Sequence, residues 1–592
     1  MNRFILALFS SCLLLSNIEF NNGPYGEEYF DIAAPFTVQD LNSPPKGDIN
    51  NDFILNIQDI IFILQYILGI NQDIDWFNDG DINDDNFIDV NDIIIMVDSI
   101  INGYTSDWVF SDEWNGNESY IFFNYTNSSS SLIASNNKEE LLSKSPMNVH
   151  YFFISDRSSY MNDINNLKSI FDTILSDMPV ELQNHWQKHL HFIPVKTSNL
   201  PGAYNWLKNV LYGEDTIAID RFQRIRETGS FSDPVNFVGR NIDYLAYEAI
   251  YFNSEFDNLY EPDKDYDEIT IFERELYSGW WNASISKNVN FPSNDELLNY
   301  AGMSVELLRG CPDCGLFDAG ATQIECGDVI NYSDSGCDDY DRIARLYICD
   351  SNGENCYESA RWITPFARQP HHLTDISPLL PLLIPGGDKV IKFQESGWPN
   401  SLLTLKFRFY KDSNISSKPK EIFPIWNGTV LFDSNYGDNR PATIFNVPEN
   451  ATKVEFVSYI TGHGWGNSTC YNCAEFCNSR HIFSINGGVF EFDKDFPEAS
   501  LEAHCMSLDM ISEGTIPNQY GTWGYGRAGW CPGLDVDPII KDITNYLEIG
   551  DENIIDYDAC RVSGASCVTP PSCGTCGYCP EIAMSSYIVI YY

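Results

Sequence analysis

The sequence contains few basic residues for its length of 592. Only 35 Lys and Arg residues stand against 84 Asp and Glu residues, which gives a formal net charge of −49. A charge of this size and sign repels nucleic acids and anionic membrane surfaces. We therefore exclude a nucleic-acid partner and interpret the charge as an acidic, solvated surface.

Long apolar runs are also missing after the N-terminus, where no stretch approaches the roughly 20 residues that a membrane-spanning helix needs. The chain begins with MNRFILALFSSCLLLS, in which Arg3 precedes an apolar run that ends in small residues. This layout is typical of a secretory signal peptide, which we predict over residues 1–20. We expect the mature protein to be exported, either secreted or associated with the cell surface, without a transmembrane segment.

Cysteine is absent between Cys12 and Cys311. The chain has 17 cysteines, and setting aside Cys12 in the signal leaves 17 − 1 = 16, an even number confined to the C-terminal half. Cys-x-x-Cys segments, such as the one starting at Cys311, also occur in zinc sites. Export and even parity favour disulfide bonds over zinc for this half of the chain.

An internal repeat is present before residue 110, because the segment that starts at Gly47 returns at Gly80. Each copy is a loop rich in Asp and Asn, followed by an apolar helical stretch. Oxygen ligands at positions 1, 3, 5, 9 and 12, with a backbone carbonyl at position 7, are typical of EF-hand calcium loops. The predicted ligands are Asp48, Asn50, Asp52, Ile54, Asn56 and Asp59 in the first loop and Asp81, Asn83, Asp85, Phe87, Asp89 and Asp92 in the second.

The paired units, residues 45–103, resemble a type I dockerin module. The resemblance implies two bound Ca²⁺ ions and a cohesin-like docking partner. Phe53 and Asn86 stand at position 6, where Gly usually makes the turn, and this departure predicts a reduced calcium affinity. The alternative is a degenerate module that folds without specific docking.

Residues 104–265 predict an α/β domain, because strand-like runs alternate with helical ones. His189 and His191 form an HLH sequence that could be a metal pair. On a strand both would share one face, with no third ligand nearby in the sequence. We interpret them as ordinary packing or surface histidines, and the sequence indicates no function for this domain.

From residue 266 the pattern changes to short alternating strands separated by Gly, Pro, Asn and Asp, which is typical of antiparallel sandwiches. The length fits two sandwiches, over residues 266–425 and 426–592. The predicted fold class is mainly β, with two adjacent antiparallel sandwiches preceded by a small helical module and an α/β domain.

Three segments of this half hold acidic residues in constrained settings. Asp341 stands beside Arg342 at the start of a strand, and an adjacent guanidinium can hold a carboxylate ionised. Glu395 ends another strand. In the CAEFC segment, residues 473–477, the two cysteines can close a small loop that points Glu475 outward.

These segments, with GTWGYGRAGWCPG at 521–533, resemble the peptide-N-glycosidase F family over residues 266–592. RWITPF at 361–366 and TGHGWG at 461–466 add to the resemblance. It implies two adjacent eight-stranded jelly rolls with the active site in the cleft between them. It also implies hydrolysis of the amide that joins Asn to the first N-acetylglucosamine of an N-glycoprotein or N-glycopeptide, with no cofactor for catalysis.

The resemblance implies individual roles in this cleft. Asp341 corresponds to the main catalytic aspartate, which acts on the attacking water or on the amide. Glu475 and, less directly, Glu395 correspond to acidic residues that bind the sugar and its bridging waters. The remaining predicted substrate contacts are arginines that orient carboxylates and tryptophans that offer apolar faces to sugar rings: Arg342, Arg527, Trp398, Trp465, Trp523 and Trp530.

The resemblance also implies a disulfide framework. The expected pairs are Cys311 with Cys337, Cys349 with Cys356, Cys473 with Cys477, and Cys505 with Cys531. The 25 residues between Cys311 and Cys337 are interpreted as an insertion closed by Cys314 with Cys326. Three further bridges have an open connectivity among Cys470, Cys560, Cys567, Cys573, Cys576 and Cys579.

Two other functions stay open on the sequence. Copper monooxygenases that hydroxylate peptides share the double jelly-roll layout, but their copper needs several His and a Met. Here His371 and His372 form a pair, while the His-x-His sequence lies upstream in the α/β segment, so the ligands are scattered. The other alternative is a non-catalytic glycan-binding scaffold that is anchored by the repeats.

Overall fold

The computed structural model describes residues 18–43, 45–50, 55–71, 76–83, 85–102, 106–202, 205–229, 231, 241–311, 337–398, 400–411, 417–570, 572–575 and 578–592. These belong to two compact units, Met1–Thr228 with Arg240–Asn253 and Gly229–Gly239 with Ser254–Tyr592. The predicted signal peptide lies outside the described residues up to position 17. Within the described ranges, none of the helices combines the length and the apolar character that a membrane crossing requires.

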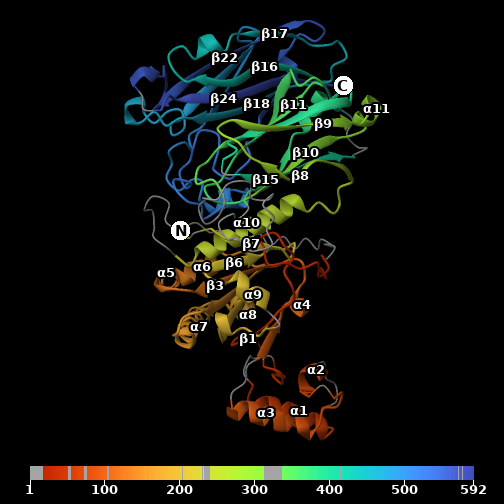
Figure 1. Ribbon diagram of the computed structural model, residues 1–592, viewed down its shortest axis with the longest axis vertical. Coiled ribbons are helices and arrows are strands. Elements are labelled where there is room, and N and C mark those ends of the chain that lie inside the picture. The colour runs from red at the N-terminus through yellow and green to blue at the C-terminus, as the bar shows by residue number, and fades with distance from the viewer. Residues whose placement is uncertain are drawn as a thin grey trace. The chain divides into compact units, whose positions relative to one another are not determined.

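The repeat region forms a small helical module with helices α1 (Ile57–Ile67), α2 (Phe77–Gly80) and α3 (Val90–Asn102) (Figure 1). The apolar positions of the two copies meet in one core, which contains Ile63 of α1 and Met96 of α3, both fully buried. Pairing two copies gives each helix an apolar partner that it would lack alone.

The last position of each loop ties the loop to its helix. The carboxylate of Asp59 accepts hydrogen bonds from the backbone N–H groups of Ile49 at 3.0 Å and Asn56 at 2.9 Å. Asp92 accepts in the same way from Ile82 at 2.8 Å and Asp89 at 2.7 Å. In the described residues the two copies therefore share the anchoring of the last loop position as well as a sequence pattern.

Position 6 of the second loop keeps its turn without glycine. Asn86 has a φ of +65°, in the left-handed region that Asn tolerates better than most residues. Asp81 supports this turn, because its carboxylate accepts the N–H of Asn86 at 2.7 Å. Two predicted ligands of the first loop, Asp52 and Ile54, lie outside the described residues.

The α/β part is built on a mixed sheet. Its strands, as far as the chain is described, have the order β5-β4-β3-β6-β7, with β3, β4 and β5 parallel and β6 and β7 antiparallel. The strands are β3 (Ser119–Tyr125), β4 (Val149–Ser155), β5 (Leu190–Lys196), β6 (Thr216–Ile219) and β7 (Ile225–Glu227). The helices are α4 (Phe110–Glu113), α5 (Ser128–Ile133), α6 (Lys138–Lys144), α7 (Tyr160–Ser176), α8 (Val180–His189), η1 (Thr197–Asn199), α9 (Asn205–Val210) and α10 (Tyr244–Leu259).

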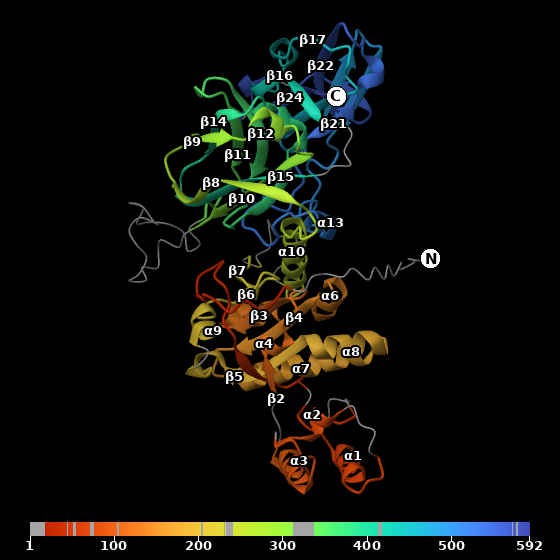
Figure 2. The same ribbon diagram turned by 90° about the vertical axis from the view of Figure 1, so that its right-hand side faces the viewer.

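Both faces of this sheet are covered, as expected for parallel strands. On one face Phe153 of β4 and Phe192 of β5 pack against Phe171 of α7, at ring-centroid distances of 5.4 and 5.9 Å. Figure 2 shows α7 and α8 along this side of the strands. On the other face Phe152 packs against Trp108 at 4.8 Å.

The segment before the helical module also belongs to the α/β part. Strand β1 (Thr37–Asp40) pairs antiparallel with β2 (Ser106–Val109), so the module is an insertion between two paired strands. Phe36 and Val38 lie in the same apolar core as Phe152. Residues 21–44 lie between the predicted signal peptide and the predicted helical module and had no domain prediction.

The second unit contains two antiparallel β-sandwiches. In its described residues the first sandwich has sheets of order β13-β10-β15-β8 and β12-β11-β14-β9. Its elements are β8 (Tyr266–Tyr277), β9 (Ala283–Phe291), α11 (Asn294–Leu297), β10 (Gly302–Gly310), β11 (Ile343–Cys349), β12 (Cys356–Ile363), β13 (His371–Asp375), η4 (Ser377–Leu383), β14 (Gly387–Glu395) and β15 (Ser401–Tyr410).

The second sandwich has, within the described chain, sheets of order β16-β24-β18-β21 and β17-β22-β19-β20, with β23 paired to β22. Its strand β16 starts at Pro419, earlier than the boundary predicted at residue 426. The elements are β16 (Pro419–Leu431), η5 (Gly437–Asn439), β17 (Thr443–Asn446), β18 (Lys453–His463), η6 (Ser468–Cys470), β19 (Ser479–Ile485), β20 (Phe490–Asp495), α13 (Leu508–Ser512), β21 (Ile539–Asp542), η7 (Thr544–Tyr546), β22 (Glu552–Ser563), β23 (Ser566–Val568), η8 (Cys573–Thr575) and β24 (Glu581–Tyr591).

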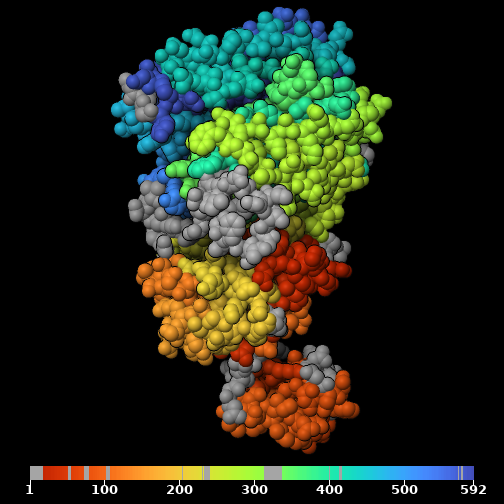
Figure 3. All heavy atoms as spheres, viewed as in Figure 1, coloured from red at the N-terminus to blue at the C-terminus, as the bar shows by residue number. Residues whose placement is uncertain are grey.

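The two sandwiches form one body, which the space-filling view shows as a yellow-green part directly against a cyan and blue part (Figure 3). Tyr459 and Val589 of the second sandwich lie in the same apolar cluster as the core of the first. A buried polar contact also holds the two sandwiches in a defined orientation at this junction. Arg361 of β12 binds Glu358 through two hydrogen bonds of 2.6 and 2.9 Å and donates to the carbonyl oxygen of Ala583 across the junction at 2.9 Å.

Candidate active site

Both sandwiches contribute side chains to one cavity of about 290 Å³. From the first sandwich come Trp281, Asn282, Asp341, Arg342, Arg345 and Glu395, and from the second come His463, Glu475 and Trp530. The predicted acidic residues thus come from three distant parts of the chain and meet at one place. The buried contacts of Arg361 hold together the two sandwiches that carry these acidic residues.

Asp341 stands where the chain enters β11. The neighbouring backbone is held on both sides, because the N–H of Arg342 donates to Oγ1 of Thr364 at 2.8 Å and the N–H of Thr364 donates to the carbonyl of Arg342 at 2.9 Å. These bonds continue the pairing of β11 with β12 beyond the strand end. Asp341 is therefore presented from a fixed edge of a sheet.

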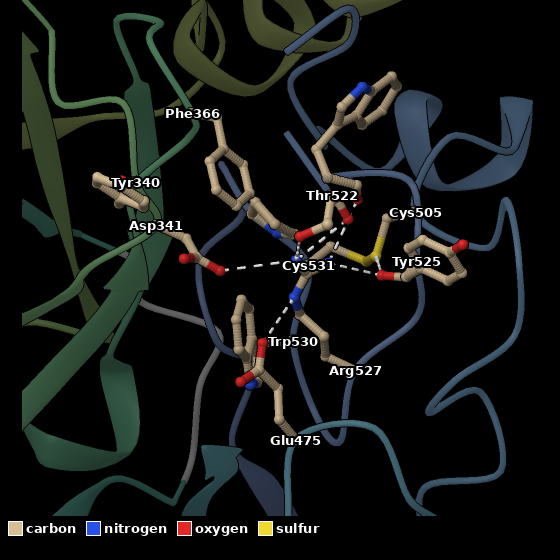
Figure 4. Close-up of polar contacts among 12 residues, drawn as sticks. Tyr340, Asp341, Phe366, Glu475, Cys505, Thr522, Tyr525, Arg527, Trp530 and Cys531 are labelled. Carbon is tan, nitrogen blue, oxygen red and sulfur yellow. Dashed lines mark hydrogen bonds and ion pairs between the residues drawn. A yellow bond between two sulfur atoms is a disulfide. The ribbon is translucent and has the colours of Figure 1, made fainter. Parts of the chain in front are cut away.

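Arg527 lies between the carboxylates of Asp341 and Glu475 (Figure 4). Its Nη2 atom is 3.7 Å from Oδ2 of Asp341, and its Nε atom donates to Oε1 of Glu475 at 3.3 Å. The arginine side chain is fully buried, while those of Asp341 and Glu475 are 21% and 16% exposed. The cation is inside the protein and the two carboxylates reach the cavity.

The guanidinium of Arg527 is held in place by backbone carbonyls. It donates to the carbonyl oxygen of Tyr525 at 2.7 Å, to that of Thr522 at 3.2 Å and to that of Trp523 at 3.4 Å. The disulfide between Cys505 and Cys531 closes the same segment. The position of the positive charge is therefore set before any substrate arrives, which is the preorganisation that electrostatic catalysis requires.

Glu475 is held by a tight loop. The Cys473–Cys477 disulfide closes this loop, and the carbonyl of Glu475 accepts the N–H of Ala528 at 2.9 Å. Gly462 makes room for it, because a side chain there would collide with the backbone oxygen of Ala474. Gly462, the first glycine of the TGHGWG segment, thus allows the loop that carries Glu475 to lie close to β18.

Burial raises the pKa of Asp341, while the positive charge of Arg527 lowers it to a smaller extent. Burial likewise raises the pKa of Glu475, again against Arg527, and the charge of Asp341 adds to the increase. Two carboxylates that share one cation resist simultaneous ionisation. A pKa moved toward neutrality suits a carboxyl group to proton transfer in the neutral pH range.

Glu395 closes the cavity from β14 and has a different partner. Its Oε2 atom is 2.8 Å from Nε of Arg309 on β10, and both side chains are at most 2% exposed. Burial raises the pKa of Glu395 to about 7, although Arg309 lowers it. The hydroxyl of Tyr277 accepts the N–H of Glu395 at 2.8 Å and fixes the strand end.

Arg342 does not pair with its sequence neighbour Asp341. Its Nε atom donates to Oδ2 of Asp338 at 2.8 Å, and its guanidinium stacks over Trp281 at 4.2 Å. Within the described residues, Asp341 forms its ion pair with Arg527 instead. Arg342 still lines the cavity, so its predicted role as a substrate contact stays a prediction.

The four predicted tryptophans have different surroundings. Trp530 lines the cavity and donates from Nε1 to the carbonyl of Gly462 at 2.8 Å. Trp398 and Trp465 are 46% and 51% exposed and lie outside the cavity lining. Trp523 is only 1% exposed, so its ring is not available to a sugar in this structure.

Several cavity residues were not anticipated from the sequence. His463 stacks on Trp530 at 5.3 Å, and its Nε2 atom lies 2.7 Å from Oγ1 of Thr461. Burial, together with nearby arginines, moves the pKa of His463 well below its ordinary value, so this ring is neutral at neutral pH. The position of His463 inside the TGHGWG segment was the sequence signal that could have identified it as a cavity residue. Trp281 and Arg345 had no such motif.

The disulfides follow the expected framework where the chain is described. Bridges join Cys311 to Cys337, Cys349 to Cys356, Cys473 to Cys477 and Cys505 to Cys531. Two pairs that had been left open are Cys560 with Cys567 and Cys573 with Cys579. Cys470 is also disulfide-bonded. The predicted pair of Cys314 with Cys326 and the residue Cys576 lie outside the described residues.

Residues 433–589 match the family described as Peptide-N-glycosidase F, C terminal. The chain is similar to peptide-N(4)-(N-acetyl-beta-D-glucosaminyl)asparagine amidase F of Elizabethkingia miricola, with 26% identity over 291 residues, which are 45% of this chain and 76% of that protein.

Among solved structures, PNGase F, a glycosylasparaginase from Flavobacterium meningosepticum, superposes with a TM-score of 0.40 at 18% identity, covering 55% of this chain and 96% of that one. A structure of PNGF-II superposes with a TM-score of 0.38 at 14% identity, covering 55% of this chain and 65% of that one.

Proposed function

We propose that the cavity between the two sandwiches hydrolyses the amide bond that joins asparagine to the first N-acetylglucosamine of N-glycopeptides or N-glycoproteins. The observation that carries the proposal is Arg527, a buried and fixed cation held against the carboxylates of Asp341 and Glu475 at the cavity wall. The similarity to an asparagine amidase over 76% of that relative's length supports the substrate class.

The reaction needs a water activated toward the amide carbon and a proton delivered to the leaving nitrogen. Asp341 takes the proton of the water, because its pKa is raised by burial and its carboxylate reaches the cavity. The C–N bond breaks as the new C–O bond completes, and the proton returns to the departing glycosylamine. The peptide then carries Asp in place of Asn.

The other residues orient the substrate and the carboxylates. Glu475 offers carboxyl oxygens to sugar hydroxyls, and the ring of Trp530 gives an apolar face. Glu395 pairs with Arg309 at the cavity wall and, with a fully buried side chain, has no direct sugar contact in this scheme. Arg527 favours the ionised forms of Asp341 and Glu475 and restricts their movement, and it does not reach the substrate itself because its side chain is fully buried. Trp523 has no place in this scheme because it is buried.

Replacement of Asp341 by Asn tests the scheme. The Asp341→Asn variant should bind glycopeptide with nearly unchanged affinity but lose turnover by a factor of about 10²–10⁴, the usual contribution of a positioned acid–base group. Asp339→Asn is the matched control, since Asp339 is an exposed neighbour outside the cavity lining. Equal turnover in both variants would refute the role of Asp341, whereas glycopeptide binding without turnover in the native chain would mark the protein as a glycan-binding scaffold.

We also propose that the helical module binds two Ca²⁺ ions through its repeat loops and provides a docking surface for a cohesin-like partner. Both loops share the anchoring of their last aspartate, Asp59 or Asp92, to backbone N–H groups. Export guided by residues 1–20 is part of the same proposal, because disulfide bonds persist outside the cytosol.

A further inference from the structure

A cluster of histidines and a glutamate lies in the α/β part, outside the cavity described above. It consists of Glu118, just before β3, His150 on β4 and His189 at the end of α8. One ligand atom from each comes within 4.8 Å of the other two. The sequence interpretation of His189 as a packing or surface residue assumed a strand and no third ligand. The structure instead ends a helix at His189 and brings two distant partners to it.

For neutral rings, the hydrogen bonds around the cluster indicate which ring nitrogens carry the protons. Nδ1 of His189 lies 2.8 Å from the carbonyl oxygen of His185, which can only accept, so Nδ1 holds the proton. The other nitrogen, Nε2, then has a lone pair. It faces Oε1 of Glu118 at 3.2 Å, which is again an acceptor.

The proton position on His150 is assigned in the same way, through its hydrogen bond with His191 and the bond of His191 with Asp40. Oδ2 of Asp40 is 2.8 Å from Nδ1 of His191, and Nε2 of His191 is 2.9 Å from Nδ1 of His150. With protons on both Nδ1 atoms, Nε2 of His150 presents a lone pair to Oε2 of Glu118 at 3.2 Å. With neutral rings, two lone pairs and one carboxylate converge without a proton between them, which is the arrangement that a metal ion can bridge.

We propose that Glu118, His150 and His189 bind one Zn²⁺ ion, which replaces the missing protons. Two imidazoles and one carboxylate form a donor set that zinc accepts. Each carboxylate oxygen of Glu118 faces one histidine at 3.2 Å, Oε2 toward Nε2 of His150 and Oε1 toward Nε2 of His189. One ligand atom from each of the three residues lies within 4.8 Å of the other two, a spacing that a small adjustment brings to the roughly 3.3 Å between ligand atoms of a tetrahedral zinc. The partial exposure of Glu118, 18%, leaves room for a water molecule as the fourth ligand.

The groups that surround these three residues are arranged like the second coordination sphere of a metal site. Histidines that bind metals usually donate their other N–H to a carbonyl or carboxylate. His189 does so to His185, and His150 does so through His191 to Asp40, whose side chain is fully buried. Asp40 lies on β1, so the pairing of β1 in the α/β core gives this part of the chain a role at the site.

The test uses the intact chain without a histidine tag, stripped with chelator and returned to calcium-containing buffer. Zinc is titrated in competition with a chromophoric chelator, so that the calcium loops are filled and only zinc is counted. We expect one equivalent of zinc. Glu118→Gln and His189→Asn should weaken binding by about 100-fold or more, and Asp40→Asn by about 10- to 100-fold. The control Glu113→Gln removes the same charge from an exposed position and should bind like the native chain.

A second readout does not depend on the folding of any variant. Nitrogen NMR of the histidine side chains in the native chain should show two Nε2 signals that move when zinc is added. Cobalt in place of zinc should give the strong visible absorption of a four-coordinate site. No zinc uptake by the native chain, or uptake that Glu118→Gln and His189→Asn leave unchanged, would overturn the proposal. Glycopeptide hydrolysis plays no part in this test, so either proposal can fail alone.

Discussion

Replacing Arg527 by Met removes the buried charge that Asp341 and Glu475 share and keeps a side chain of similar length. The nearest atoms of Arg527 and Asp341 are 3.7 Å apart. Unit charges at this distance attract by about 4.5 kcal/mol at an effective dielectric constant of about 20, which corresponds to about three pKa units. Asp341 is 21% exposed, so solvent screens part of this attraction and we expect a shift of about 1–2 units.

The direction of the change follows from the role of Asp341 as a base. Its pKa in the folded protein is already raised by burial, and loss of Arg527 raises it further. Activity that needs the ionised carboxylate is lost as the pH falls through that pKa. The acid limb of the kcat/KM profile should therefore move to higher pH by about 1–2 units in Arg527→Met.

The assay is the pH dependence of kcat/KM on a defined N-glycopeptide. Arg527→Lys should restore part of the shift because it keeps the charge. Arg480→Met is the matched control, since Arg480 pairs with Asp495 on neighbouring strands β19 and β20 and its loss should leave the profile in place. Circular dichroism and thermal melting establish that each variant is folded. A folded Arg527→Met enzyme with an unmoved acid limb would refute the reasoning.

Three further predictions concern other parts of the protein. Glu358→Ala leaves the buried guanidinium of Arg361 without its carboxylate and should destabilise the unit by about 3–5 kcal/mol in denaturant titrations, whereas the exposed Glu354→Ala should be nearly neutral. Replacing both cysteines of the Cys473–Cys477 bridge by Ala frees the loop of Glu475 and should lower kcat/KM by about tenfold or more; unchanged kinetics would contradict the positioning role. Removal of calcium with EGTA should lower the melting temperature of the helical module in calorimetry and leave glycopeptide turnover intact, and a transition indifferent to EGTA would argue against calcium loops.

Local patterns carried much of the fold prediction. The strand alternation after residue 266 indicated antiparallel sandwiches. The strand-like runs predicted within residues 104–265 include SYIFFNY at 119–125 and VHYFFIS at 149–155, which are β3 and β4 in the structure. For these elements the signal lies within a few residues, where periodicity restricts the backbone. The pair of Cys349 with Cys356 came instead from the family resemblance, and the structure contains it.

Contacts between distant segments could not be read in the same way. Arg309 pairs with Glu395 across the first sandwich, and Arg342 pairs with Asp338 instead of Asp341. Sequence adjacency suggested the wrong partner because successive residues near a strand end point in different directions. The cluster at Glu118 escaped notice for the same reason, since its members come from three separate elements that only the sheet order brings together.

The most direct test of the proposed chemistry is the fate of water oxygen. The native chain is incubated with a defined N-glycopeptide in water labelled with heavy oxygen, with EDTA in a parallel sample, and the peptide product is examined by mass spectrometry. Amide hydrolysis by positioned carboxylates predicts an Asp peptide with one labelled oxygen in its side-chain carboxylate, in equal yield with EDTA. A product that keeps an unlabelled Asn, with or without a residual sugar, or no product at all while glycopeptide still binds, would contradict the account.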